Sequence, residues 1–165
     1  MVRWTRGALA LSCAAGIGVA VYMYAMSPER VPVHYGLSGT PDRWGSRLEL
    51  LLVYASAIVI GSAIFLGVPA LLRYAPARTI SIPNKHYWLA AEHREEAAHK
   101  LALWSDVQGA AVNLLMITLQ LVLAPSASEP SSAVLGGVLG GFGVFTLGTM
   151  IWLSLAYRLP VDGER

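Results

Sequence analysis

The sequence predicts an all-α integral membrane protein, in which four membrane-spanning helices form one bundle with an extracytoplasmic loop cap and a cytoplasmic amphipathic helix. Of its 165 residues, 55% are hydrophobic and only 13% are charged, whereas a soluble domain carries about 25% charged residues. The hydrophobic residues also form four blocks of roughly the 20 residues that cross a hydrocarbon core. These blocks are residues 7–26, 48–72, 107–124 and 133–157, within a single membrane domain that covers 1–165.

Charge and cysteine content exclude several classes of protein. The formal net charge is only +2 and the basic residues are scattered, so we expect no nucleic-acid partner. Cys13 is the only cysteine, which excludes an internal disulfide and a thiolate metal cluster. We therefore expect no cofactor and no bound metal.

The first block, 7–26, has a competing interpretation as a signal peptide, because a short basic segment precedes it. Its end, VYMYAMS, is bulky and lacks a small-residue cleavage site, so we expect an uncleaved span. The second block, 48–72, follows Ser46 and Glu49, which have the spacing of a capping box and predict a helix start there.

A polar segment, 73–106, separates the second block from the third, and we expect it to be cytoplasmic. His86, Tyr87 and Trp88 are predicted to lie at the membrane interface. Residues 90–105 are predicted to form an amphipathic helix that carries a Glu96–Lys100 ion pair at i,i+4 spacing. The third block, 107–124, is the most polar, and we expect Asn113 and Gln120 to form hydrogen bonds between helices.

The fourth block contains two overlapping small-xxx-small patterns, which allow helix backbones to approach closely in a membrane. Two interpretations are open. The patterns serve packing within the bundle, which we favour, or they bind a membrane-protein partner or a second copy of the chain. The helix-packing candidates are Gly136, Gly137, Gly140 and Gly141.

Basic residues predict the orientation. Of the 12 Lys and Arg residues, three lie in the 27–47 loop, and the other nine lie at the termini or in 73–106. Because Lys and Arg accumulate on the cytoplasmic side, we expect both termini in the cytoplasm and the 27–47 loop outside an inner (cytoplasmic) membrane. The four blocks contain no ionisable group at depth apart from Glu49 at the start of the second, which argues against a pump or an ion-coupled transporter.

The outer loop, 27–47, is the polar segment to which we assign any activity, since it must lie in water or among headgroups. Residues 30–35 alternate as in a short strand, and Gly36–Gly39 form a turn. Thr40 and Pro41 predict one helical turn, in which Asp42 caps the turn or pairs with Arg43 or Arg47. Trp44 is expected at the headgroups.

His34 and Asp42 are the chemically most active pair in this loop. The interpretation we favour is that they form a hydrogen bond within the loop and fix its fold. The alternative is that they bind an extracytoplasmic peptide or a lipid headgroup. A metal site is disfavoured there because no third ligand has suitable spacing, and His86, His93 and His99 are better explained as solvated residues.

Two motifs together resemble the bacterial membrane domain of unknown function 1648. The first lies in the outer loop and comprises Pro32, His34, Tyr35, Gly39, Pro41, Asp42, Trp44 and Arg47. The second is the cytoplasmic IPNKHYWL stretch, with Pro83, Asn84, Tyr87 and Trp88. The resemblance implies a domain that links a first span to a second. One branch of that family is the immunity protein against the sporulation-delaying toxin, which implies a role in immunity.

These observations favour a non-enzymatic accessory or regulatory membrane protein, which packs with a partner or senses a ligand at the 28–47 loop. No nucleophile, base and orienting acid share a signature spacing, so an enzyme is not expected. A toxin-immunity or peptide-binding module is the first alternative. A membrane enzyme that acts on lipid at the outer surface is the second.

Overall fold

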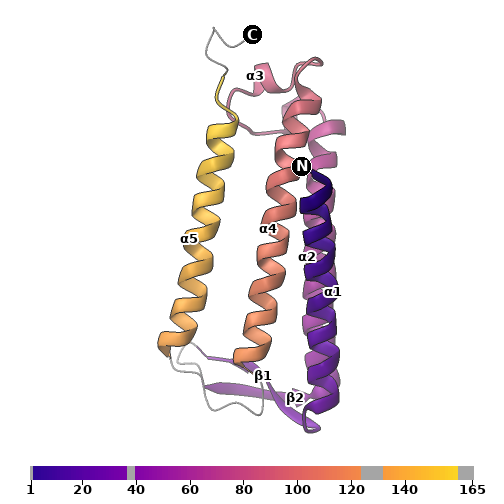
Figure 1. The fold of residues 1–165 in the computed structure, drawn as a ribbon, viewed down its shortest axis with the longest axis vertical. Coiled ribbons are helices and arrows are strands. Elements are labelled where there is room, and N and C mark those ends of the chain that lie inside the picture. The colour runs from indigo at the N-terminus through magenta and orange to yellow at the C-terminus, as the bar shows by residue number, and fades with distance from the viewer. Residues whose placement is uncertain (1, 37–39, 124–131, 160–165) are drawn as a thin grey trace.

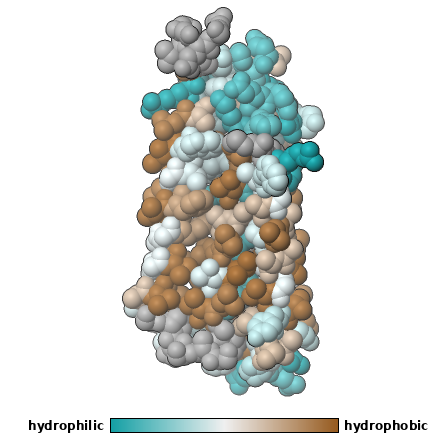
Figure 2. Space-filling view, in the orientation of Figure 1, coloured by the Kyte–Doolittle hydropathy of each residue, from teal (hydrophilic) through white to brown (hydrophobic). Residues whose placement is uncertain are grey.

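The computed structural model describes residues 2–36, 40–123 and 132–159. Four of its helices are long and apolar enough to cross a membrane, as the sequence predicts. Each long helix runs in the opposite direction to the one before it in the chain, and a small β-hairpin covers one end of the bundle (Figure 1). Hydrophobic residues form a band around the middle of the visible face, and hydrophilic residues gather toward the two ends (Figure 2). This distribution is that of a multi-pass membrane protein.

The first two long helices extend beyond the predicted blocks. Helix α1 is Val2–Met26, so it includes the basic residues Arg3 and Arg6 before the apolar block. Helix α2 is Arg47–Tyr74 and begins as the capping signal predicts, since the Ser46 side chain accepts a hydrogen bond from the backbone N–H of Glu49. Pro69 lies inside α2, near its end.

The segment 73–106 is not separated from the third span, as the predicted bounds implied. A short 3-10 helix, η1 (Ala77–Thr79), and helix α3 (Lys85–Trp88) occupy its first part. The expected amphipathic helix and the third span then form a single continuous helix, α4 (Arg94–Val122). The Glu96–Lys100 ion pair is confirmed, with 3.1 Å between its charged atoms. The chain has no Pro or Gly between 90 and 108, so nothing in the backbone interrupts α4.

Helices α1, α2 and α4 pack closely into a three-helix core. Small residues permit the approach: a side chain at Gly109 of α4 would lie 2.9 Å from Leu9 and 3.0 Å from Phe65. A side chain at Gly16 of α1 would lie 2.8 Å from Ile58. Without a hydrophobic driving force in lipid, this close fit is what associates the helices.

A buried amide joins the three helices at mid-depth. Asn113 of α4 donates hydrogen bonds of 3.1 Å to both Ser12 of α1 and Ser62 of α2. This confirms the interhelical role predicted for Asn113. The same prediction is wrong for Gln120, whose side-chain amide donates to the Met116 carbonyl of its own helix. Helix geometry places Gln120 within reach of that carbonyl four residues earlier.

Helix α5 (Ser132–Ala156) stands apart from the core and faces α4 (Figure 1). No residue of its apolar window is buried. The packing that we favoured for its glycines is therefore wrong: a side chain at Gly136, Gly137, Gly140 or Gly141 would have nothing within 4 Å. Halfway along, Gln108 of α4 bonds the hydroxyls of Thr146 (2.9 Å) and Thr149 (3.0 Å).

The outer loop forms a two-stranded antiparallel sheet of β1 (Arg30–Tyr35) and β2 (Pro41–Ser46). The helical turn predicted at Thr40 and Pro41 is wrong, because Pro41 pairs with Tyr35 as the first residue of a strand, where a missing N–H is tolerated. The register shifts on both sides of His34, which breaks the strict alternation we expected. Val31 and Pro32 are both buried.

Candidate functional site

The hairpin brings His34 and Asp42 together, with His34 paired in register with Arg43, the neighbour of Asp42. Their side chains meet through Nδ1 and Oδ1 at 2.6 Å, and both are exposed. This confirms the expected hydrogen bond within the loop, and among the described residues Arg43 pairs with Glu49 and Arg47 faces Tyr24 instead of Asp42. An exposed contact of this kind adds only about 0–1 kcal/mol to stability, so it contributes little to holding the fold.

Arginines fasten the rest of the hairpin to its surroundings. Arg43 pairs with Glu49, in the first turn of α2. Arg47 lies 5.1 Å above the ring of Tyr24 in α1. Arg30 lies 6.0 Å from the ring of Trp44, which is 52% exposed and free to meet headgroups. Gly39 lies outside the described residues.

Tyr35 connects the hairpin to the end of α4. Its hydroxyl donates a 3.0 Å hydrogen bond to the Leu123 carbonyl, at the end of α4. Burial raises the pKa of the Tyr35 phenol, so the hydroxyl keeps its proton and remains a donor throughout the physiological pH range. The hairpin is therefore attached to α1, α2 and α4.

A small pocket lies beneath the hairpin, between these three helices. Three tyrosines and an arginine line it (Tyr24, Tyr35, Tyr54 and Arg47), together with Pro32 of the motif. Its volume is about 10 Å³, which is room for one water-sized group. Gln120 also lines it, and the Gln120 side-chain oxygen is buried without a hydrogen-bond partner. A buried acceptor without a partner is costly, so the pocket is suited to a hydrogen-bond donor.

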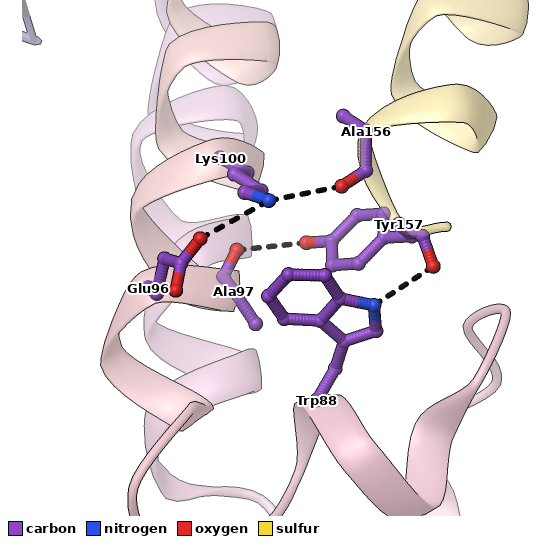
Figure 3. Close-up of polar contacts among 6 residues, drawn as sticks. All are labelled: Trp88, Glu96, Ala97, Lys100, Ala156 and Tyr157. Carbon is purple, nitrogen blue, oxygen red and sulfur yellow. Dashed lines mark hydrogen bonds and ion pairs between the residues drawn. The ribbon is translucent and has the colours of Figure 1, made fainter. Parts of the chain in front are cut away.

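The second motif forms a clasp around the end of α5, at the opposite end of the bundle. Asn84 and the Trp88 indole both donate to the Tyr157 carbonyl, at 2.9 and 2.8 Å. The Tyr157 hydroxyl donates to the Ala97 carbonyl at 2.7 Å, and Lys100 donates to the Ala156 carbonyl at 3.0 Å (Figure 3). Because the last carbonyls of a helix have no partner within it, these donors complete the end of α5.

The clasp buries Trp88 against the protein, so the ring does not present the exposed surface that we expected of an interfacial aromatic. Trp88 is only 2% exposed and packs edge-on against Tyr157, with ring centroids 5.6 Å apart. Tyr87 is half-buried and stacks on His93 at 4.0 Å, while Pro83 is exposed. Asn84 has a left-handed backbone, with φ of 51°, which asparagine tolerates better than most residues. The aromatic content suggested an interface, whereas the indole N–H had a backbone partner that spacing does not reveal.

The end of α2 is completed in the same way. Arg94, the first residue of α4, donates to the Leu72 carbonyl at 2.8 Å and also to the Ala75 carbonyl. Arg73 and Glu95 form a two-pronged ion pair beside it, at 2.9 and 2.6 Å. A cation at a helix C-terminus is favourable for the helix dipole, so residues 84–100 hold the ends of both α2 and α5.

Asp106 is a functional candidate that sequence reasoning missed. It is fully buried, and its Oδ2 accepts a 3.1 Å hydrogen bond from Thr5 of α1. Its Oδ1 lies 3.5 Å from the Arg6 guanidinium and has no hydrogen bond. The hydroxyl of neighbouring Ser105 is also buried and unpaired. The predicted third block began at residue 107, so Asp106 was assigned to the polar segment. Its position one residue before an apolar run was the available signal.

Metal chemistry gains no support from the described ranges, since they contain no group of three His, Cys, Asp or Glu residues able to hold an ion. Within those ranges His34 and Asp42 lie together, but His86, His93 and His99 do not form a site.

Comparison with known proteins supports the first of the two motifs. The model of the family described as Domain of unknown function (DUF1648) matches residues 11–58, which include most of α1, the hairpin and the first part of α2. An archaeal protein from Archaeoglobus fulgidus, named only as uncharacterized, is 48% identical over 63 residues. That match covers 38% of this chain and 30% of the archaeal protein, so the chain corresponds to less than a third of that relative.

No solved structure matches the chain. Neither of the two sequence matches names a toxin-immunity protein, so membership of that branch stays a prediction. The relative is archaeal, and the expectation of a bacterial protein therefore gains no support from it.

Proposed function

We propose that this chain is a non-enzymatic accessory or regulatory membrane protein, which packs through α5 against a partner membrane protein. The observation that carries the proposal is the open side of α5. Positions Gly136, Gly137 and Gly140 have free space around them, and the described part of the chain buries none of the apolar window of α5. Small residues on an unoccupied helix face suit close contact with another transmembrane helix.

The proposal includes the orientation that the basic residues favour. Both termini and the clasp would face the cytoplasm of a cell bounded by an inner membrane, and the hairpin would face outward. The clasp fixes one end of α5 to α4, so a partner would meet a helix whose position is already set.

The test is purification from native membranes in a mild detergent, with the mass of the complex measured by light scattering. We expect the wild-type chain to travel with a partner or a second copy. Gly140→Leu should reduce this complex at least tenfold, because a branched side chain separates the backbones. Gly67→Leu is the matched control, since Gly67 lies in α2 and also has nothing within 4 Å. A wild-type chain that is a clean monomer contradicts the proposal.

A second candidate, a peptide-binding or toxin-immunity module, is favoured by the pocket beneath the hairpin. Its unpaired Gln120 oxygen would accept a donor group from a peptide that reaches in past Tyr35 and Arg47. In a protection assay against a secreted peptide toxin, we expect Gln120→Leu to lower protection at least tenfold while the chain still inserts into the membrane. Unchanged protection removes this candidate.

A further inference from the structure

A groove runs along the outside of α4, between α1 and α5. Its floor is formed by α4 residues that include Ala111 and Leu114, with Thr5 and Ala8 of α1 on one side and Phe142 of α5 on the other. Its volume is about 500 Å³, and no charged side chain lines it. In a membrane this space is not empty, because hydrocarbon or a helix must fill an apolar groove of this size.

A second hollow, of about 390 Å³, lies beyond the groove, between α4 and α5. Leu103 of this hollow is one turn before Val107 of the groove, and Trp152 is two turns after Phe145. Residues four and seven apart lie on the same side of a helix, so the two hollows follow one another along one side of α4 and α5, and together we call them the path. The second hollow differs in chemistry, since Glu95, Glu96, His99 and Lys100 line it.

We infer that this path binds one zwitterionic phospholipid, with an acyl chain in the groove between α1, α4 and α5 and the headgroup among Glu96, His99 and Lys100. The polar end and the apolar remainder match the two parts of a single amphiphile. From Lys100 to Leu114 the path is about 21 Å long at 1.5 Å per residue, which exceeds half of a hydrocarbon core of about 30 Å. An acyl chain of one leaflet therefore fits along it.

The charges at the polar end determine the headgroup. Lys100 already donates to Ala156 and pairs with Glu96, so His99 is the donor for a phosphate, and the outer side of the Glu96 carboxylate is an acceptor for an ammonium group. Glu96 already pairs with Lys100 at 3.1 Å, and Glu95 pairs with Arg73. The local charges are therefore balanced, and an anionic headgroup gains no excess of positive charge. A headgroup with both a phosphate and a primary ammonium, as in phosphatidylethanolamine, complements His99 and Glu96.

The test measures which lipid stays with the protein. The full chain is reconstituted into nanodiscs with equal parts of phosphatidylethanolamine and phosphatidylglycerol, extracted in mild detergent and weighed by native mass spectrometry. We expect one phosphatidylethanolamine per chain. Ala111→Trp fills the groove and should lower the retained fraction at least tenfold. Ala63→Trp, on the exposed face of α2, should leave it unchanged.

Glu96→Gln tests the headgroup separately, because it keeps the groove and removes the carboxylate. We expect this variant to retain a phospholipid while losing its preference for phosphatidylethanolamine over phosphatidylglycerol. If Ala111→Trp melts below the wild type, Leu114→Phe replaces it. A wild-type chain that retains no lipid, or equal retention by the groove variant, overturns the inference. A second copy of the chain cross-linked in the groove overturns it as well.

Discussion

Trp88→Ala is expected to lower the free energy of unfolding by about 3–5 kcal/mol, the cost of truncating a buried large aromatic. The indole fills the space between the start of α4 and the end of α5, at 2% exposure. Its N–H satisfies the Tyr157 carbonyl at 2.8 Å, and its ring supports the Lys100 ammonium at 4.0 Å. The truncation removes the packing and one of the bonds that attach α5. Denaturant unfolding in a fixed detergent measures the loss.

Two further variants separate these contributions. Trp4→Ala is the matched control, since Trp4 is 85% exposed and a surface substitution costs within about 0.5 kcal/mol. Trp88→Phe keeps most of the packing and loses the hydrogen bond, so we expect a loss of about 1–3 kcal/mol for the carbonyl contact and the smaller ring. A loss below about 1 kcal/mol for Trp88→Ala shows that the clasp does not hold α5.

Arg6→Met is expected to lower the free energy of unfolding by about 2–4 kcal/mol. It leaves the fully buried Asp106 carboxylate with only the Thr5 hydroxyl as a partner. Breaking a buried pair by removing one member costs about 3–5 kcal/mol. The value here is set lower because Arg6 is half exposed and solvent screens part of the interaction. Equilibrium unfolding of the purified chain measures it.

The double variant Arg6→Met, Asp106→Leu decides whether the charge itself is responsible. Replacing both members of a buried pair by apolar residues is often neutral or stabilising, so we expect stability to return to within about 1 kcal/mol of the wild type. The coupling between the two positions is then a direct measure of the pair. A double variant no more stable than Arg6→Met contradicts this account and assigns the cost to lost packing of the Arg6 stem.

The four spans were predictable because a membrane-spanning helix is recognised from the hydrophobicity of about 20 consecutive residues. That signal does not depend on which other parts of the chain the helix contacts. The continuity of α4 was not predictable in the same way. The first part of α4 is polar and the remainder is apolar. Composition therefore predicted a boundary near residue 107, although the backbone helix continues through it. Asp106 lies at that boundary, and its burial depends on Thr5 and Arg6, which are about a hundred residues away.

The candidate site was predictable in part. The His34–Asp42 contact followed from two polar residues on either side of a turn. The strand at Pro41–Ser46 did not, because Thr-Pro-Asp is also a good helix start and only pairing with β1 decides between the two. The clasp around α5 was beyond the sequence. Its acceptor is a backbone carbonyl at Tyr157, and the identity of a residue does not reveal where its carbonyl lies.

The clasp has a consequence for how the chain is built. The donors that bind the end of α5, Asn84, Trp88 and Lys100, are synthesised before α5, while the Tyr157 hydroxyl donates in the opposite direction, to the Ala97 carbonyl. Domains and helices emerge from the ribosome in order from the N-terminus, so the receiving half of this joint is complete while the last helix is still being made. We expect α5 to enter the membrane last and to bind donors that are already in place. In a nascent chain stalled before Ser132, these donors would have no α5 carbonyls to bind and would be accessible to a factor that guides insertion.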